Sequence, residues 1–163
     1  MKEANELTSE IYSLIGQWEP KLASLSHEVI SHPRNCQNRN IKQILGHLID
    51  SASNNVHRII HLHYQPSPLV FPNYASLGNN DRWIAIQNYQ QEEWADMIQL
   101  WKYLLFHYCH LVKNIQDDKL ENEWIAGPDR KIALKSLVID FNRHFKLHLR
   151  EIEELISKSN GSL

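Results

Sequence analysis

The hydrophobic and polar positions of the chain follow the period of an α-helix in four long stretches. Apolar side chains recur at steps of three and four over residues 5–31, 40–64, 84–116 and 133–157. This spacing places them on one stripe of each helix. Almost no stretch alternates with the period of two that half-buried strands need. The pattern therefore predicts an all-α domain.

Proline and the capping residues predict where the first two helices begin and end. Pro20 lies inside the first stretch, and we expect it to kink or divide that helix, because proline lacks an N–H and crowds the preceding turn. Asn40 and Gln43 have the spacing of a capping box, which predicts a helix start at residue 40.

Two long connections join the later helices. Residues 65–83 contain three prolines and several turn residues, so they cannot continue a helix. Connections of this length inside a compact domain are usually functional or disordered, and Phe71, Tyr74 and Trp83 favour a packed loop here. Residues 116–132 form the second connection, for which the pattern indicates no helix.

The four amphipathic helices bury their apolar stripes most simply as a four-helix bundle. The 163 residues suit a single domain, 1–163, which is long enough to bury a sizeable core. The long connections permit a crossover as well as a plain up-and-down order, and the pattern does not choose between them.

Charge and cysteine content exclude several classes of protein. The formal charge is −2, and the 17 Lys and Arg are scattered among 19 Asp and Glu, whereas a nucleic-acid-binding face needs concentrated basic residues. Cys36 and Cys109 are too few for a disulfide framework. No apolar run approaches the length of a membrane span or of a signal peptide. We therefore expect a cytoplasmic protein with neither a nucleic acid nor a membrane as partner.

Ten histidines raise the prospect of a metal site, because neutral imidazole is the commonest protein metal ligand. His144 and His148 stand four residues apart on the last predicted helix, so both rings can reach one ion. Chance also produces such pairs, and the spacing alone leaves a purely structural role open. The di-iron bundle pattern is excluded, because no Glu in the chain is followed three residues later by His.

The other histidines have weaker patterns. His47 lies away from the centre of the apolar face of its helix, on an arc with Asp50, Ser51, Asn54 and Arg58, and taken alone it is predicted to be solvated or at the flank. If it is a ligand, the metal must lie at the edge of the bundle in a groove open to water. Two further pairs of histidines are close in sequence. His57 and His61 follow the polar arc of the same helix, where a solvated face is expected. His107 and His110 lie near Cys109, and His110 suits either a supporting hydrogen-bond donor or a place at the core edge.

Four segments of the chain resemble the signature segments of the DinB/YfiT-like superfamily, in the same order and with similar separations. They read "ILGHLIDSASNN", "FPNY", "IQNYQQEEWADMIQLWKYL" and "LVIDFNRHFKLHLREIEEL", and together they extend over about residues 40 to 156. The most specific element is the histidine of "GHLID" combined with H-x-x-x-H on the last helix.

The resemblance implies a four-helix bundle, often dimeric, in which three such histidines bind a divalent metal. The ligands implied here are His47, His144 and His148, and the implied assembly is a homodimer. Relatives often carry a second histidine directly before the final ligand, where this chain has Leu147, which weakens any role for an extra imidazole. Histidine-only sites suit zinc or nickel first, with iron, manganese or copper as alternatives.

The resemblance also implies two kinds of chemistry on a small-molecule substrate. Characterised relatives include metal-dependent transferases and isomerases that use low-molecular-weight thiols, and others are labelled as metal-dependent hydrolases. Three neutral imidazoles leave a divalent ion with an open position, as catalytic sites require. Asp50 and Asp140, each one turn from a histidine, are the expected catalytic carboxylates, either to orient an imidazole or to accept a proton. For each of them a solvated carboxylate on the helix face is the alternative.

A thiol cofactor with carboxylates would need cationic groups in the groove, for which Arg58 and Arg143 are the candidates. Two other functions stay open at this point. One is a bundle that binds metal or a ligand without turnover, as a stress-related protein. The other is a helical interaction module in which the histidines are incidental.

Overall fold

The computed structural model describes residues 3–76 and 78–160. The chain begins with helix α1 (Ala4–Ala23), followed by the short helix α2 (His27–Ser31). Pro20 lies inside α1, which continues for one further turn, so the predicted first helix is divided at residues 24–26 and not at the proline. Ser26 starts the new helix there, because its side chain accepts a hydrogen bond from the Val29 N–H.

Helix α3 (Ile41–Tyr64) begins and ends as the sequence predicts. The Asn40 side chain accepts from the Gln43 N–H, and the Gln43 side chain accepts from the Asn40 N–H, which completes the predicted capping box. Unlike the other helices, α3 is buried on most sides. The polar arc of Asp50, Asn54 and Arg58 is buried together with the apolar stripe, so the alternative of a solvated Asp50 carboxylate on the helix face is wrong.

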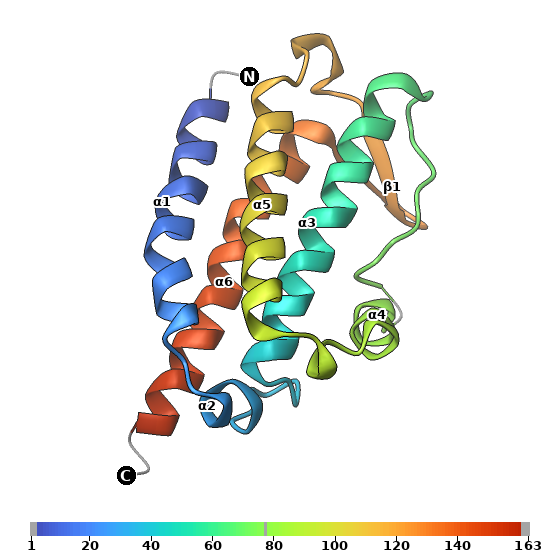
Figure 1. The fold of residues 1–163 in the computed structure, drawn as a ribbon. Helices are drawn as coiled ribbons and strands as arrows, with labels where there is room; N and C mark the ends of the chain where they lie inside the picture. The colour runs from blue at the N-terminus through green and yellow to red at the C-terminus, as the bar shows by residue number, and fades with distance from the viewer. Residues whose placement is uncertain (1–2, 77, 161–163) are drawn as a thin grey trace.

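The connection after α3 runs back along the bundle, as Figure 1 shows. It contains helix α4 (Asn79–Gln87) and a 3₁₀ turn, η1 (Tyr89–Gln91), before α5 begins at Trp94. The predicted third helix, 84–116, therefore starts ten residues too early. Asn88 is the reason for the break, because its backbone is left-handed, with φ +50°, and ends α4.

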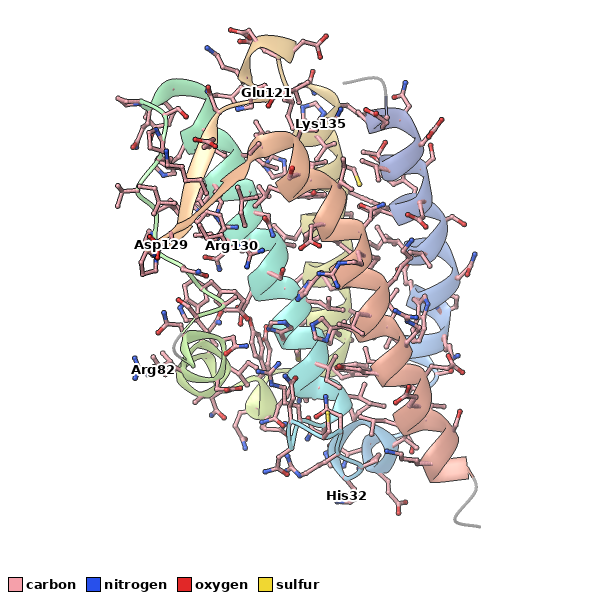
Figure 2. The ribbon with its side chains drawn as sticks, turned by 180° about the vertical axis from the view of Figure 1, so that it is seen from behind. His32, Arg82, Glu121, Asp129, Arg130 and Lys135 are labelled. Atoms are coloured by element: carbon pink, nitrogen blue, oxygen red, sulfur yellow. The ribbon has the colours of Figure 1, made fainter. Side chains whose placement is uncertain are left out.

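Helix α5 (Trp94–Lys113) leads through the 3₁₀ turn η2 (Asp117–Lys119) to a hairpin that the sequence pattern missed. Strand β1 (Glu123–Gly127) pairs antiparallel with β2 (Arg130–Ala133), with Trp124 opposite Ile132. The connection from α3 to α5 is called the crossover below, and its Leu69 forms an isolated parallel bridge with Trp124. The hairpin runs beside α3, and its tip at Arg130 points toward the end of the bundle that carries α4 (Figures 1 and 2).

Helix α6 (Leu134–Asn160) completes a bundle made of α1, α5, α3 and α6. Figure 1 shows that α3 and α5 run in one direction and that α1 and α6 run in the other. The structure thus confirms the predicted four-helix bundle and selects the crossover order. In the described part of the chain, the short helices α2 and α4, two 3₁₀ turns and a small two-stranded sheet are added to it.

The core follows the predicted apolar stripes. Its largest fully buried side chains include Trp101, Tyr108 and Phe145, and the Trp101 and Phe145 rings stack with centroids 6.1 Å apart. In the described part of the chain, no helix combines the length and apolar character that crossing a membrane requires. Cys36 is exposed, Cys109 is buried, and both are free thiols.

Candidate metal centre

His47 lies in the second turn of α3, on the side that faces α6. Its side chain is only 4% exposed. The helical pattern alone predicted a solvated or flank position for His47, because the pattern carries no information about what covers that flank. In the structure Tyr74 of the crossover covers it, with ring centroids 5.6 Å apart.

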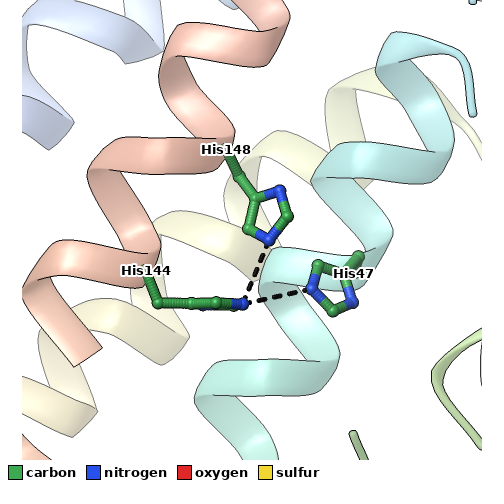
Figure 3. Close-up of side chains that lie close together, drawn as sticks. All are labelled: His47, His144 and His148. Carbon is green, nitrogen blue, oxygen red and sulfur yellow. Dashed lines mark hydrogen bonds between the residues drawn. The ribbon is translucent and has the colours of Figure 1, made fainter. Parts of the chain in front are cut away.

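His144 and His148 extend from successive turns of α6 toward His47, as Figure 3 shows. The Nε2 atom of His144 lies 3.3 Å from Nε2 of His47 and 3.0 Å from Nε2 of His148. One ligand atom from each ring lies within 4.8 Å of the other two. The structure therefore brings together the three histidines that the resemblance implied as ligands, from positions about a hundred residues apart.

The outer nitrogens of two rings have partners of their own. His47 Nδ1 lies 2.7 Å from the Tyr74 hydroxyl, and His148 Nδ1 lies 2.9 Å from a carboxylate oxygen of Glu151. A carboxylate accepts a hydrogen bond, so His148 carries its proton on Nδ1 and directs the lone pair of Nε2 toward the other histidines. The Nδ1 atom of His144 is buried and has no hydrogen-bond partner among the described residues.

The environment keeps all three rings neutral. Burial, together with the neighbouring histidines, lowers the pKa of His47 from 6.5 to about 2 and that of His144 to about 4. Burial also lowers the pKa of His148, although Glu151 opposes this effect. Neutral imidazole is the form that binds a metal ion.

These features fit a divalent metal ion. Zinc–nitrogen bonds of 2.0–2.1 Å in a tetrahedron place neighbouring ligand nitrogens about 3.3 Å apart, close to the separations found here. A shared cation at this point would be bound by the Nε2 lone pairs of all three neutral rings at once. His47, His144 and His148 are therefore the residues that would hold the ion.

Asp50 is the centre of a buried hydrogen-bond network one turn beyond His47. Its carboxylate accepts from the Tyr89 hydroxyl at 2.7 Å, from Gln87 Nε2 at 2.6 Å and, more weakly, from the Tyr74 hydroxyl at 3.4 Å. Burial raises the pKa of Asp50, and the three donors partly offset that shift. Asp50 thus lies behind Tyr74 and contacts His47 through it.

Gly46, in the "GHLID" segment, leaves the space that Tyr89 needs to join this network. A Cβ atom at this position would lie 2.2 Å from Cδ2 of Tyr89. The Tyr89 ring therefore packs directly on the backbone of α3, which brings its hydroxyl to Asp50. Neither Gly46 nor Tyr89 was expected to have this role, although a glycine inside a helix is a signal of close packing.

Asp140, the other expected carboxylate, occupies a different kind of position. It is exposed, accepts a hydrogen bond from Arg143 Nε at 2.7 Å and lines a cavity together with His144. Glu151, for which the sequence pattern predicts no role, is the carboxylate that contacts a histidine directly. Its i+3 spacing from His148 was the available signal.

The remaining histidines lie outside this group. His57 is exposed and His61 is partly buried on α3, where His61 contacts Tyr64 and Gln65. His107 and His110 are exposed on α5 with stacked rings. The supporting donor role considered for His110 is wrong, because Tyr74 and Glu151 provide the partners instead.

A cavity of about 640 Å³ adjoins the histidines, between α3, α6, the hairpin and the crossover. His47 and His144 form part of its wall, and so does Tyr74. Of the two other aromatic residues that favoured a packed loop, Phe71 packs near Arg58, and Trp83 packs edge-on against Tyr74 with centroids 5.2 Å apart. Both therefore support the wall from behind.

Comparison with solved structures identifies the architecture. YfiT from Bacillus subtilis, described as "a probable metal-dependent hydrolase with an unusual four-helix bundle topology", superposes with a TM-score of 0.83 over 98% of this chain and 89% of YfiT, at 15% sequence identity. The fold is YfiT-like. At this identity the likeness establishes the fold and not the activity.

No family model and no curated protein sequence matches the chain. The YfiT-like bundle is therefore evident from the structure, whereas the chemistry of the site must be argued from its own residues.

Proposed function

We propose that the protein is a metal-dependent enzyme in which His47, His144 and His148 bind one divalent ion and a small-molecule substrate binds in the adjoining cavity. The observation that carries the proposal is the convergence of three neutral imidazoles, two of them oriented by partners on their outer nitrogens. Three protein ligands are the number found in catalytic zinc sites, whereas structural sites usually have four.

When bound, such an ion supplies Lewis-acid chemistry and lowers the pKa of a water or a small thiol toward neutrality. Hydrolysis is the reaction we favour, in accord with the description of the structurally similar YfiT. Transfer to a low-molecular-weight thiol is the alternative, and the cationic residues of the cavity wall suit the carboxylates of such a cofactor.

The side chains around the site have separable roles in this proposal. Glu151 and Tyr74 hold the rings of His148 and His47, and Asp50 in turn fixes the Tyr74 hydroxyl, so Asp50 acts as a positioning residue. Asp140 lines the cavity and is solvent-accessible, so it is the carboxylate that can exchange a proton with a bound substrate.

Metal analysis of purified protein tests the proposal. We expect one zinc or nickel ion per chain, and we expect His47→Ala and His148→Ala each to reduce this content to near zero. His57→Ala is the matched control, because it removes an exposed imidazole from the same helix and should leave the content unchanged. Equal metal content in the wild type and both site variants would rule the site out.

Activity assays then separate the reaction classes. An ester and amide panel, assayed with the zinc-loaded and the chelated protein, tests hydrolysis directly. Thermal stabilisation of the zinc-loaded protein by a small thiol would instead favour thiol transfer, because a ligand that binds only the folded state raises its melting temperature. Metal binding with neither response would indicate a non-catalytic binding protein.

A further inference from the structure

Arg58 is a buried cation without an anionic partner among the described residues. Its side chain is only 5% exposed, two turns beyond Asp50 on α3, and no carboxylate forms an ion pair with it. Its Nη1 donates to the Asn55 side chain at 3.2 Å, while Nε is buried and makes no hydrogen bond. Burial lowers the pKa of Arg58 to about 10, so the guanidinium is still charged at neutral pH.

The surroundings hold this guanidinium in place without neutralising it. It stacks on the Trp124 ring of β1, 3.7 Å from the centroid, and lies 5.4 Å from the centroid of Phe71. Aromatic faces attract a cation but cannot accept the hydrogen bonds of its N–H groups. A buried guanidinium without an anion raises the free energy of the folded state. A carboxylate or phosphate matches it best, because such an oxyanion can accept two parallel hydrogen bonds from the planar guanidinium.

Arg58 also lines the cavity that contains His47 and His144. The other charged residues of this wall are Arg130, Lys131, Arg143 and Asp140, so the lining carries four cations against one carboxylate. Arg143 is already paired with Asp140, and Lys131 lies 3.6 Å from Glu123, which leaves Arg58 as the buried cation available to a ligand. Figure 2 shows Arg130 at the hairpin tip, on the rim of the same region.

The Arg58 guanidinium and the three histidines are separated by about the length of a small molecule. Arg58 follows His47 by eleven residues, and its head group reaches back one turn to Asn55. At a rise of 1.5 Å per residue, the guanidinium therefore lies about 12 Å from the level of His47 along the helix. A ligand that spans the cavity can meet both ends.

We infer that Arg58 binds the carboxylate or phosphate group of an anionic small molecule, whose other end reaches the three histidines. The inference rests on the proposed function only in calling that molecule the substrate, since the anion site itself needs no metal. It restricts the substrate class to compounds that carry an oxyanion remote from the reacting group.

A matched pair of probes tests the anion site. Titrations of 4-phenylbutyrate and 4-phenylbutanol, which differ mainly in the carboxylate, are followed through the indole N–H signal of Trp124 by NMR. A charge-assisted hydrogen bond corresponds to roughly ten- to hundredfold in affinity, so we expect the wild type to prefer the carboxylate by at least about tenfold. Chelated protein and zinc-loaded protein should both show this preference.

Variants assign the preference to Arg58. Arg58→Gln should abolish it, and Arg58→Lys, which keeps the charge but loses the fork, should retain a weaker preference. Arg150→Gln is the control, because Arg150 is an exposed residue of a separate groove along α6. Melting temperatures of all variants confirm that they fold before binding is compared.

The outcomes distinguish this inference from the proposed function. No preference in the wild type, or an equal preference in Arg58→Gln, would overturn the anion site. A preference seen only with zinc and unchanged in Arg58→Gln would assign the carboxylate to the metal and overturn it as well. The titrations of chelated protein test the anion site even if metal analysis shows that the histidines bind no ion.

Discussion

At the scale of single residues, the site depends on side chains that support the histidines from behind. Tyr74, Glu151 and Asp50 orient the imidazoles directly or through one intermediary, and Tyr89 can reach Asp50 only because residue 46 is a glycine. The identity of residue 46 therefore affects the shape of the site without any contact with a ligand.

Gly46→Ala should destabilise the protein, because the new Cβ would overlap the Tyr89 ring. Overpacking of this kind costs about 1–3 kcal/mol in the free energy of unfolding, measured by urea denaturation. Gly16→Ala is the control, since a Cβ at the exposed Gly16 of α1 meets nothing within 4 Å. That substitution should be neutral or stabilising by up to about 1 kcal/mol, and an equal effect at both positions would contradict the packing argument.

At the scale of elements, the sequence predicted what local periodicity encodes. The start of α3 at the Asn40 capping box, its end at Tyr64 and the i, i+4 placement of His144 and His148 on α6 were all found as expected. These features depend on residues within a few positions of one another, so a single sequence is enough to predict them.

Features that depend on tertiary contacts were missed or misplaced. The polar arc of α3 has the pattern of a solvated face, yet the crossover and the hairpin cover it. The hairpin was assigned to a connection, although Gly127, Pro128 and Asp129 between two short apolar runs are a turn signal. Without the positions of these covering segments, neither the burial of His47 nor that of Arg58 could be predicted.

Helix α6 places Glu151 one turn beyond His148, which leads to a prediction on metal affinity. Glu151→Gln replaces the carboxylate acceptor of the His148 Nδ1 proton with a neutral amide. Loss of such a supporting partner typically weakens metal binding by about 10- to 100-fold. Competition with a chromophoric chelator measures this affinity. Glu154→Gln, at an exposed position of the same helix, should leave it unchanged, and an unaltered affinity in Glu151→Gln would show that the contact does not support the ligand.

At the scale of the whole molecule, α3 and α6 meet at three imidazoles, of which His47 and His148 are buried and His144 is half-buried, and this ties stability to pH. In chelated protein the folded-state pKa values of His144 and His47 are about 4 and about 2, against 6.5 in the unfolded chain. Below pH 6.5 the unfolded state therefore binds more protons than the folded state. The free energy of unfolding should fall as the pH falls from about 6.5 to 4, by up to about 1.4 kcal/mol per pH unit for each histidine.

Urea unfolding of chelated protein at pH 7, 6 and 5 measures this slope. His144→Ala removes one titrating group and should make the slope shallower, while His57→Ala should not change it. The same slope in wild type and His144→Ala would contradict the buried, neutral state of this imidazole.

The homodimer and the cytoplasmic location stay predictions. Light scattering of the purified protein measures its molar mass and so tests the homodimer.

The central claim is that one cation binds between α3 and α6. A crystal structure of the zinc-loaded protein, with anomalous data collected above and below the zinc absorption edge, tests it most directly. The account predicts a single anomalous peak at about 2.0–2.1 Å from the Nε2 atoms of His47, His144 and His148. A zinc ion bound by other residues, or zinc-loaded crystals without a peak between these three rings, would contradict it.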